Sequence, residues 1–156
     1  MDLALFAEKH QLGPAAFFSG IPGSIGGALT MNAGSFGYET WDFVESVEVI
    51  DKKGVIYHLN PNDFSLSYRT VHFPFPLWFL SCRMKFPNSE ITTKSELKEL
   101  RDQRIKTQPL SEDTCGSVFK NPEKGHAGDF IERAGLKGYR IGGSSISTKH
   151  ANFIVN

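Results

Sequence analysis

The 156-residue sequence predicts an α+β fold. A β-branched run at 44–50 meets a second apolar run at 55–57 across a turn sequence, which is the pattern of a β-hairpin. The stretch 93–107 has the apolar spacing of an amphipathic helix, and the apolar run 77–86 indicates a separate strand. This mixture of helix, hairpin and separate strands favours α+β over a doubly wound parallel sheet.

The first elements lead into a glycine-rich segment. Residues 2–11 indicate a short helix that ends near Gly13-Pro14. Residues 20–37 contain six glycines with apolar residues between them, so we expect a packed loop whose backbone lies against a flat or anionic group, such as a cofactor phosphate. The segment lacks the Lys-Ser/Thr of a Walker loop and the dinucleotide-binding G-x-G-x-x-G spacing. A glycine-kinked loop without a ligand is the alternative.

The later elements follow from local signals. Asp51-Lys52-Lys53-Gly54 forms the expected hairpin turn, and residues 60–63 indicate a turn or a helix start with proline at the first helical position. Residues 77–86 are expected to form a largely buried strand. A short helix is expected near 128–134, stopped by Gly135.

The helix at 93–107 is expected to separate two lobes. Thr93 and Glu96 have the spacing of a capping box at its start. A turn-rich region at 108–125 follows, and the chain ends just after the apolar run 153–155, in the middle of an expected strand. A chain with such an end looks truncated.

Composition excludes several classes of function. Lys plus Arg and Asp plus Glu number 17 each, so the formal net charge is zero and favours neither nucleic acid nor an anionic membrane. No signal peptide or membrane span is expected, and a disulfide between Cys82 and Cys115 is not expected. The scattered histidines predict no metal site. These observations predict a soluble protein of a reducing, cytoplasmic compartment.

Tyr68-Arg69 is the first candidate site outside the glycines. The arginine stands among apolar neighbours, so its guanidinium must be paired or bound to an anion or a π surface. A structural ion pair is the alternative interpretation.

Residues 115–122 are the second candidate site. Ser117, Lys120 and Asn121 join a hydroxyl, a cation and an amide in one turn, where the serine could act as a nucleophile or a proton donor. The G-x-S-x-G elbow of hydrolases is absent. The alternative is a Ser/Asn turn that bonds its own backbone. Cys115 is expected to be a small packed residue rather than a reactive thiol.

Five ordered segments together resemble the UDP-N-acetylenolpyruvoylglucosamine reductase family. They are GIPGSIGGALTMNAGSFG at 20–37, SYR at 67–69, GSVFKNP at 116–122, AGDFIERAGLKGYRIGG at 127–143 and STKHANFIVN at 147–156. The resemblance implies an FAD-containing enzyme of peptidoglycan precursor synthesis. With NADPH as co-substrate, such an enzyme reduces UDP-N-acetylglucosamine enolpyruvate, a UDP-sugar, to UDP-N-acetylmuramate.

The resemblance also implies a role for individual residues. Arg69 and Ser117 match catalytic residues, the first beside flavin and substrate carboxylate and the second protonating the enol intermediate. Tyr68, Lys120 and Asn121 are the implied substrate contacts. The implied FAD contacts are Gly20, Ile21, Pro22, Gly23, Gly26, Gly27, Asn32, Ala33 and Gly34. The implied fold is part of a PCMH-type FAD-binding domain over 1–90, followed by a substrate-binding α+β domain over 91–156.

Two family features have no counterpart in this sequence: an N-terminal lobe with a glycine-rich turn that grips the FAD pyrophosphate, and a late glutamate that assists protonation. We therefore expect an internal fragment that is inactive alone and binds FAD weakly or not at all. Self-association or a companion chain that supplies the missing lobe is expected. A nucleotide-sugar-binding module without catalysis, and another oxidoreductase of the same flavin superfamily, remain as alternatives.

Overall fold

The structure, a computed structural model, describes residues 2–21, 23–87 and 91–156. The chain divides into two compact units, Met1–Leu100 and Arg101–Asn156. Each unit combines helices with antiparallel strands, so the predicted α+β class is confirmed. The predicted division into an FAD-binding domain over 1–90 and a substrate-binding domain over 91–156 assigns a ligand to each part, and it stays a prediction.

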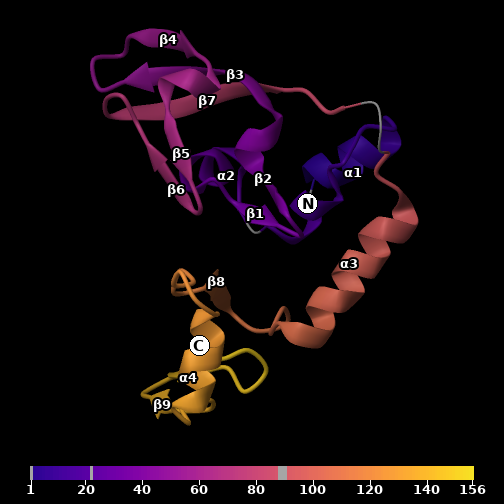
Figure 1. The fold of residues 1–156 in the computed structure, drawn as a ribbon, viewed down its shortest axis with the longest axis vertical. Coiled ribbons are helices and arrows are strands. Elements are labelled where there is room, and N and C mark those ends of the chain that lie inside the picture. The colour runs from indigo at the N-terminus through magenta and orange to yellow at the C-terminus, as the bar shows by residue number, and fades with distance from the viewer. Residues whose placement is uncertain (1, 22, 88–90) are drawn as a thin grey trace. The chain divides into compact units, whose positions relative to one another are not determined.

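A three-stranded antiparallel sheet dominates the first unit. Its central strand β3 (Val44–Asp51) pairs with β4 (Ile56–Leu59) on one side and β7 (Leu77–Met84) on the other (Figure 1). The predicted hairpin and the predicted strand are thus confirmed. The predicted burial of the strand is wrong, because Trp78 and Leu80 are 57% and 52% exposed. Only one face of this sheet packs on the core, so side chains along β7 alternate between the core and solvent.

The core on the covered face holds three short elements against the sheet. Helix α2 (Ile25–Met31) lies beside β6 (Thr70–His72), which pairs with β5 (Ser65–Ser67) (Figure 1). Trp41 is buried and its indole N–H donates to the Leu29 carbonyl at 2.8 Å. This bond, and the apolar side chains around it, position α2 against the sheet.

Two 3₁₀ turns flank this core. They cover Thr40–Phe43, which leads into β3, and Pro61–Asp63, which leads into β5. In the second, Asn60 and Asp63 form a capping box with Pro61 at the first position. The helix start predicted at 60–63 is thus confirmed.

A second cluster packs around the amino-terminal helix. Helix α1 (Asp2–Lys9) and a 3₁₀ turn (Ala16–Gly20) enclose small and aromatic side chains that are almost fully buried. Thr92 joins this cluster to the segment after β7, because its hydroxyl accepts the Ala15 N–H at 2.8 Å and its own N–H donates to the Leu12 carbonyl at 3.1 Å. The helix predicted at 2–11 is confirmed.

Helix α3 (Lys94–Thr107) carries the chain from the first unit into the second (Figure 1). The predicted capping box is present: the Glu96 N–H donates to Thr93 Oγ1 at 3.2 Å, and the Thr93 N–H donates to Glu96 Oε2 at 3.4 Å. None of its side chains is fully buried. Along the described parts of the chain, no helix has both the length and the apolar character that crossing a membrane requires.

The second unit is a small sheet with one helix. Its four antiparallel strands run in the spatial order β8 (Thr114–Ser117), β11 (Phe153–Val155), β10 (Ser144–Ile146) and β9 (Arg140–Ile141). Helix α4 (Ala127–Arg133) is followed by Gly135 at φ +71°, so the predicted short helix and its stop are confirmed.

Candidate functional site

The glycine-rich segment contains a helix, so the prediction of a loop over 20–37 is wrong in part. Ser24 caps α2 by accepting the Gly27 N–H at 3.2 Å, and Ala28 and Leu29 are buried against the core. A capped start and one buried face are enough to form a short helix despite the glycines. Farther on, β1 (Gly34–Ser35) and β2 (Tyr38–Glu39) form a tight hairpin. Of the predicted cofactor contacts here, Pro22 lies outside the described residues.

At three of these glycines, an added side chain would not clash with any described residue. A Cβ added at Gly23 would meet nothing within 4 Å, and at Gly26 or Gly27 it would meet only Ser24 Oγ, at 3.8 and 3.6 Å. Gly26 and Gly27 lie in the first turn of α2, where glycine is less stable than alanine. Gly23 has φ +95°, a conformation that favours glycine by itself, whereas at Gly26 and Gly27 the bare backbone costs stability, as expected where another molecule approaches the main chain closely. Gly34 differs, since its added Cβ would lie 2.4 Å from the Tyr38 carbonyl oxygen.

Asn32 links the end of α2 to the strands around it. The side chain is 2% exposed, its amide N–H₂ donates to Glu39 Oε2 at 2.6 Å and the Ser67 carbonyl at 3.3 Å, and its oxygen accepts the Trp41 N–H at 3.3 Å. The next carbonyl, that of Ala33, accepts both the N–H and the hydroxyl of Thr40. The bond to Ser67 ties the glycine-rich segment to the residue just before Tyr68-Arg69.

Tyr68-Arg69 forms the two-residue turn between β5 and β6. Arg69 has φ +50°, a left-handed conformation that few residues other than glycine adopt. Conformations of this kind are concentrated at ligand sites, where the surrounding structure enforces them. Tyr68 is 51% exposed, and its carbonyl accepts the Thr70 hydroxyl at 3.3 Å. Within the first unit the structure thus brings together Asn32 and this turn.

In the second unit, Ser117 ends β8 opposite Phe153 of β11. Gly116, just before it, has φ +86° and donates its N–H to Thr114 Oγ1 at 3.3 Å. Cys115 is exposed, on the edge strand β8, so the expectation that it is a packed residue is wrong. The thiol of Cys82 in β7 is half-buried, and burial raises its pKa.

Asn152 holds the two residues that follow Ser117. Its amide N–H₂ donates to the Phe119 carbonyl at 2.8 Å, its side-chain oxygen accepts the Phe119 N–H at 2.9 Å, and its backbone carbonyl accepts the Val118 N–H at 2.9 Å. Asn152 lies in the segment 147–156, which resembles the reductase family, so the sequence offered a signal for it. No role was predicted for its side chain.

Lys120 and Asn121, the predicted substrate contacts, come next and are exposed. The side-chain oxygen of Asn121 accepts the N–H of Ala127, the first residue of α4, at 3.1 Å. The connection between β8 and α4 is therefore fixed at both ends by asparagine side chains. Ser117, Lys120 and Asn121 lie along this one connection.

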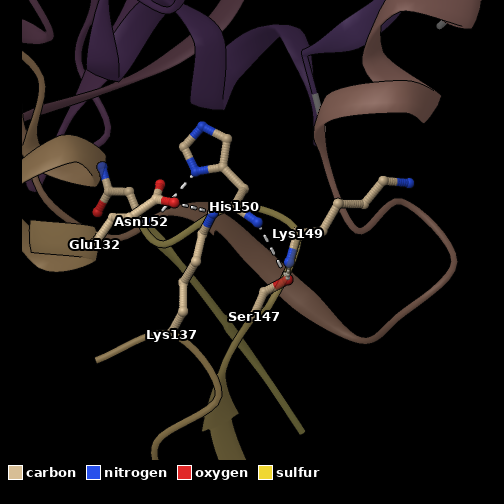
Figure 2. A network of polar contacts seen from close by, with 6 residues as sticks. All are labelled: Glu132, Lys137, Ser147, Lys149, His150 and Asn152. Carbon is tan, nitrogen blue, oxygen red and sulfur yellow. Dashed lines mark hydrogen bonds and ion pairs between the residues drawn. The ribbon is translucent and has the colours of Figure 1, made fainter. Parts of the chain in front are cut away.

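His150 supports Asn152 from the side (Figure 2). Its ring Nδ1 accepts the Asn152 N–H at 3.2 Å, while Ser147 Oγ accepts the Lys149 N–H at 3.1 Å. Burial lowers the pKa of His150, and the positive charge of Lys137 lowers it further. Lys137 itself pairs with Glu132 at 2.8 Å. A lowered pKa favours the neutral imidazole, the form whose Nδ1 can accept the Asn152 N–H.

Comparison with known proteins decides the family. Residues 2–60 match the model of an FAD binding domain, and residues 108–156 match that of the UDP-N-acetylenolpyruvoylglucosamine reductase C-terminal domain. Over 99% of this chain, the reductases of that name from Alkalilimnicola ehrlichii and Nitrosomonas eutropha are 46% and 45% identical. The chain belongs to this reductase family.

The family assignment extends to a solved structure. The crystal structure of UDP-N-acetylenolpyruvylglucosamine reductase from Thermus caldophilus matches 99% of this chain with a TM-score of 0.82 and 34% identity, over 57% of its own chain. The chain covers 52% and 49% of the two reductases named above, so it spans about half the length of the curated relatives it matches.

Proposed function

We propose that this chain is part of a flavin-dependent reductase of peptidoglycan precursor synthesis, located in the cytoplasm. The proposed reaction reduces the enolpyruvyl group of UDP-N-acetylglucosamine enolpyruvate and gives UDP-N-acetylmuramate. The observation that carries this proposal is the match, in order along one chain, to an FAD binding domain and to the reductase C-terminal domain.

The exposed glycine backbone of the first unit fits a bound FAD. Within the described chain, an added Cβ would meet nothing within 4 Å at Gly23 and only Ser24 Oγ at Gly26 and Gly27, so a flat or anionic group can approach the main chain closely. The full set of proposed FAD contacts is Gly20, Ile21, Pro22, Gly23, Gly26, Gly27, Asn32, Ala33 and Gly34. Bound FAD would supply the hydride carrier between NADPH and the substrate, while the protein binds and orients.

We assign the substrate carboxylate to Arg69. Hydride addition to the terminal carbon of the enolpyruvyl double bond moves an electron pair to the carbon beside the carboxylate. A guanidinium paired with that carboxylate stabilises the developing charge. The left-handed turn at Arg69 holds the residue between two paired strands, and the exposed Tyr68 beside it is a proposed substrate contact.

We assign the proton to Ser117. Its hydroxyl would donate a proton to the carbon beside the carboxylate, which completes the saturated product. A serine donates readily only where a cation offsets the charge left on its oxygen, and Lys120 follows in the same connection. Lys120 and Asn121 are the proposed contacts to the nucleotide sugar.

A turnover assay tests the proposed function. The protein expressed from the reading frame that carries this sequence, called the encoded protein below, would be loaded with FAD and mixed with NADPH. We expect NADPH oxidation that depends on UDP-N-acetylglucosamine enolpyruvate and yields UDP-N-acetylmuramate in equal amount. Binding of the nucleotide sugar without flavin binding would overturn the proposal in favour of a binding module, and sugar-independent NADPH oxidation would overturn it in favour of another flavin oxidoreductase.

A further inference from the structure

We propose that Asn152 is a positioning residue: its side-chain amide fixes the backbone of Phe119, next to the Val118 N–H that its backbone carbonyl accepts, and so holds Ser117 and Asn121 in place for the nucleotide sugar. The inference rests on the proposed function for its ligand. Its structural part, that one amide holds this segment, can be tested without any ligand.

The three hydrogen bonds from Asn152 form a closed clamp. The side-chain amide bonds both polar backbone groups of Phe119, as a neighbouring strand would. It donates to the carbonyl at 2.8 Å and accepts the N–H at 2.9 Å. The Asn152 carbonyl adds the Val118 N–H at 2.9 Å. These contacts begin directly after Ser117, the last residue of β8, so they continue the strand register beyond the end of the strand.

Side-chain burial holds this segment only weakly. Phe119 is 57% exposed and Val118 is 38% exposed, so little apolar surface is buried to fix their backbone. Asn152 by contrast is 4% exposed, and its part-buried hydrogen bonds to Phe119 define the backbone position more sharply than exposed bonds would. The hydrogen bonds therefore set the conformation of the segment.

Asn152 is itself held in place by neighbouring residues of its own strand region and of α4. The Asn152 N–H donates to His150 Nδ1 at 3.2 Å (Figure 2). The neighbouring Phe153 pairs with Ser117 across the two strands. An added Cβ at Gly128 of α4 would lie 3.7 Å from the Asn152 Cβ, so the helix packs closely against the residue. The amide is held from the strand side and from the helix side.

Amide hydrogen exchange of Asn152→Ala in the encoded protein gives the first test. We expect the protection factor of Phe119 to fall by about tenfold or more, because both side-chain hydrogen bonds to its backbone are removed, while Val118, whose N–H donates to the retained backbone carbonyl, should lose less. The amide of Ala134, which follows α4 and bonds to the Phe130 carbonyl, should keep its protection. The matched control is Asn156→Ala, which removes an amide from the same end of the chain whose oxygen accepts the Ser144 hydroxyl at 3.0 Å.

Asn152→Asp gives a test with nearly unchanged shape. The protonated carboxyl can both donate to the Phe119 carbonyl and accept its N–H, whereas the carboxylate only accepts. At neutral pH the carboxylate can still accept the Phe119 N–H, but its second oxygen faces the Phe119 carbonyl without a proton, and this repulsion should displace the segment and lower the protection of Phe119. Protection should recover as pH falls through the titration of the new carboxyl. Wild type and Asn152→Ala, measured at each pH, correct for the charged groups around this position, which are His150, Asp129, Glu132 and Lys137.

Binding links the clamp to function. Asn152→Ala should weaken binding of UDP-N-acetylglucosamine enolpyruvate by about tenfold or more, and Asn152→Asp should regain affinity at the pH where Phe119 regains protection. Unchanged Phe119 protection in both variants would overturn the clamp. Lost protection with unchanged affinity would overturn the positioning role. If wild type does not bind the nucleotide sugar, the proposed function and the positioning role fail together, while the exchange data still decide the clamp.

Discussion

Gly27 lies in the first turn of α2, where an added methyl group would meet only Ser24 Oγ at 3.6 Å. Gly27→Ala should therefore stabilise the free protein slightly, by up to about 0.5 kcal/mol, because alanine loses less entropy in a helix. The same methyl group would stand between the backbone and FAD. We expect FAD affinity to fall by about tenfold or more, measured by quenching of flavin fluorescence in the encoded protein.

Gly34→Ala should have the opposite effect on stability. Its Cβ would lie 2.4 Å from the Tyr38 carbonyl oxygen, so the hairpin must move and stability should fall by about 1–3 kcal/mol in urea unfolding. A Gly27→Ala protein that binds FAD as tightly as wild type would contradict the proposed contact.

His150 gives a pH dependence to the second unit. Its pKa in the folded chain lies below the ordinary value because of burial and, next, the charge of Lys137. Protonation then favours the unfolded state, so the free energy of unfolding should fall as pH drops below about 6.5, the ordinary imidazole pKa, and level off below the folded pKa. Urea unfolding of wild type and His150→Gln across pH 5–8 checks this. The variant should show a shallower fall, and parallel curves would contradict the assignment.

At the scale of elements, Thr92 lies between β7 and α3 and ties this part of the chain to the loop after α1. Thr92→Val keeps the shape but leaves the buried Ala15 N–H without the hydroxyl at 2.8 Å. We expect a loss of about 1–3 kcal/mol in urea unfolding, the usual effect of an unsatisfied buried donor. Thr107→Val removes an exposed bond to the Gln103 carbonyl in α3 and should change stability by less than about 0.5 kcal/mol. Equal effects of the two changes would contradict this role of Thr92.

Elements with local signals were predictable from the sequence. The capping box at Thr93 and Glu96 and the turn at Asp51–Gly54 rest on neighbouring residues, so their start and stop signals suffice. The helix within the glycine-rich segment was missed because glycine lowers helix propensity, and what offsets it is burial of Leu29 against a core from elsewhere in the chain.

The burial of β7 and the role of Asn152 depend on distant residues. Trp78 and Leu80 read as core residues, yet their face of the sheet is not covered in the described first unit. The partner of the Asn152 amide is Phe119, 33 residues away, and no local pattern announces that pairing. Site residues whose side chains take part in the proposed chemistry could be named from the sequence. Asn152, which we propose holds them in place, could be found only from the fold.

At the scale of the whole molecule, the proposed chemistry is divided between two units. The glycine backbone and Arg69 belong to Met1–Leu100, and Ser117 with its clamp belongs to Arg101–Asn156. The central claim is that both units serve one reduction: the first binds the flavin and the carboxylate, and the second supplies the proton.

Stopped-flow measurement of the Ser117→Ala encoded protein, loaded with FAD, tests that claim most directly. We predict that NADPH bleaches the flavin absorbance at the wild-type rate, because Ser117 has no part in that step. Reoxidation of the reduced flavin by UDP-N-acetylglucosamine enolpyruvate should slow by at least about 10²-fold, the usual effect of removing a general acid. Reoxidation at the wild-type rate would contradict the account.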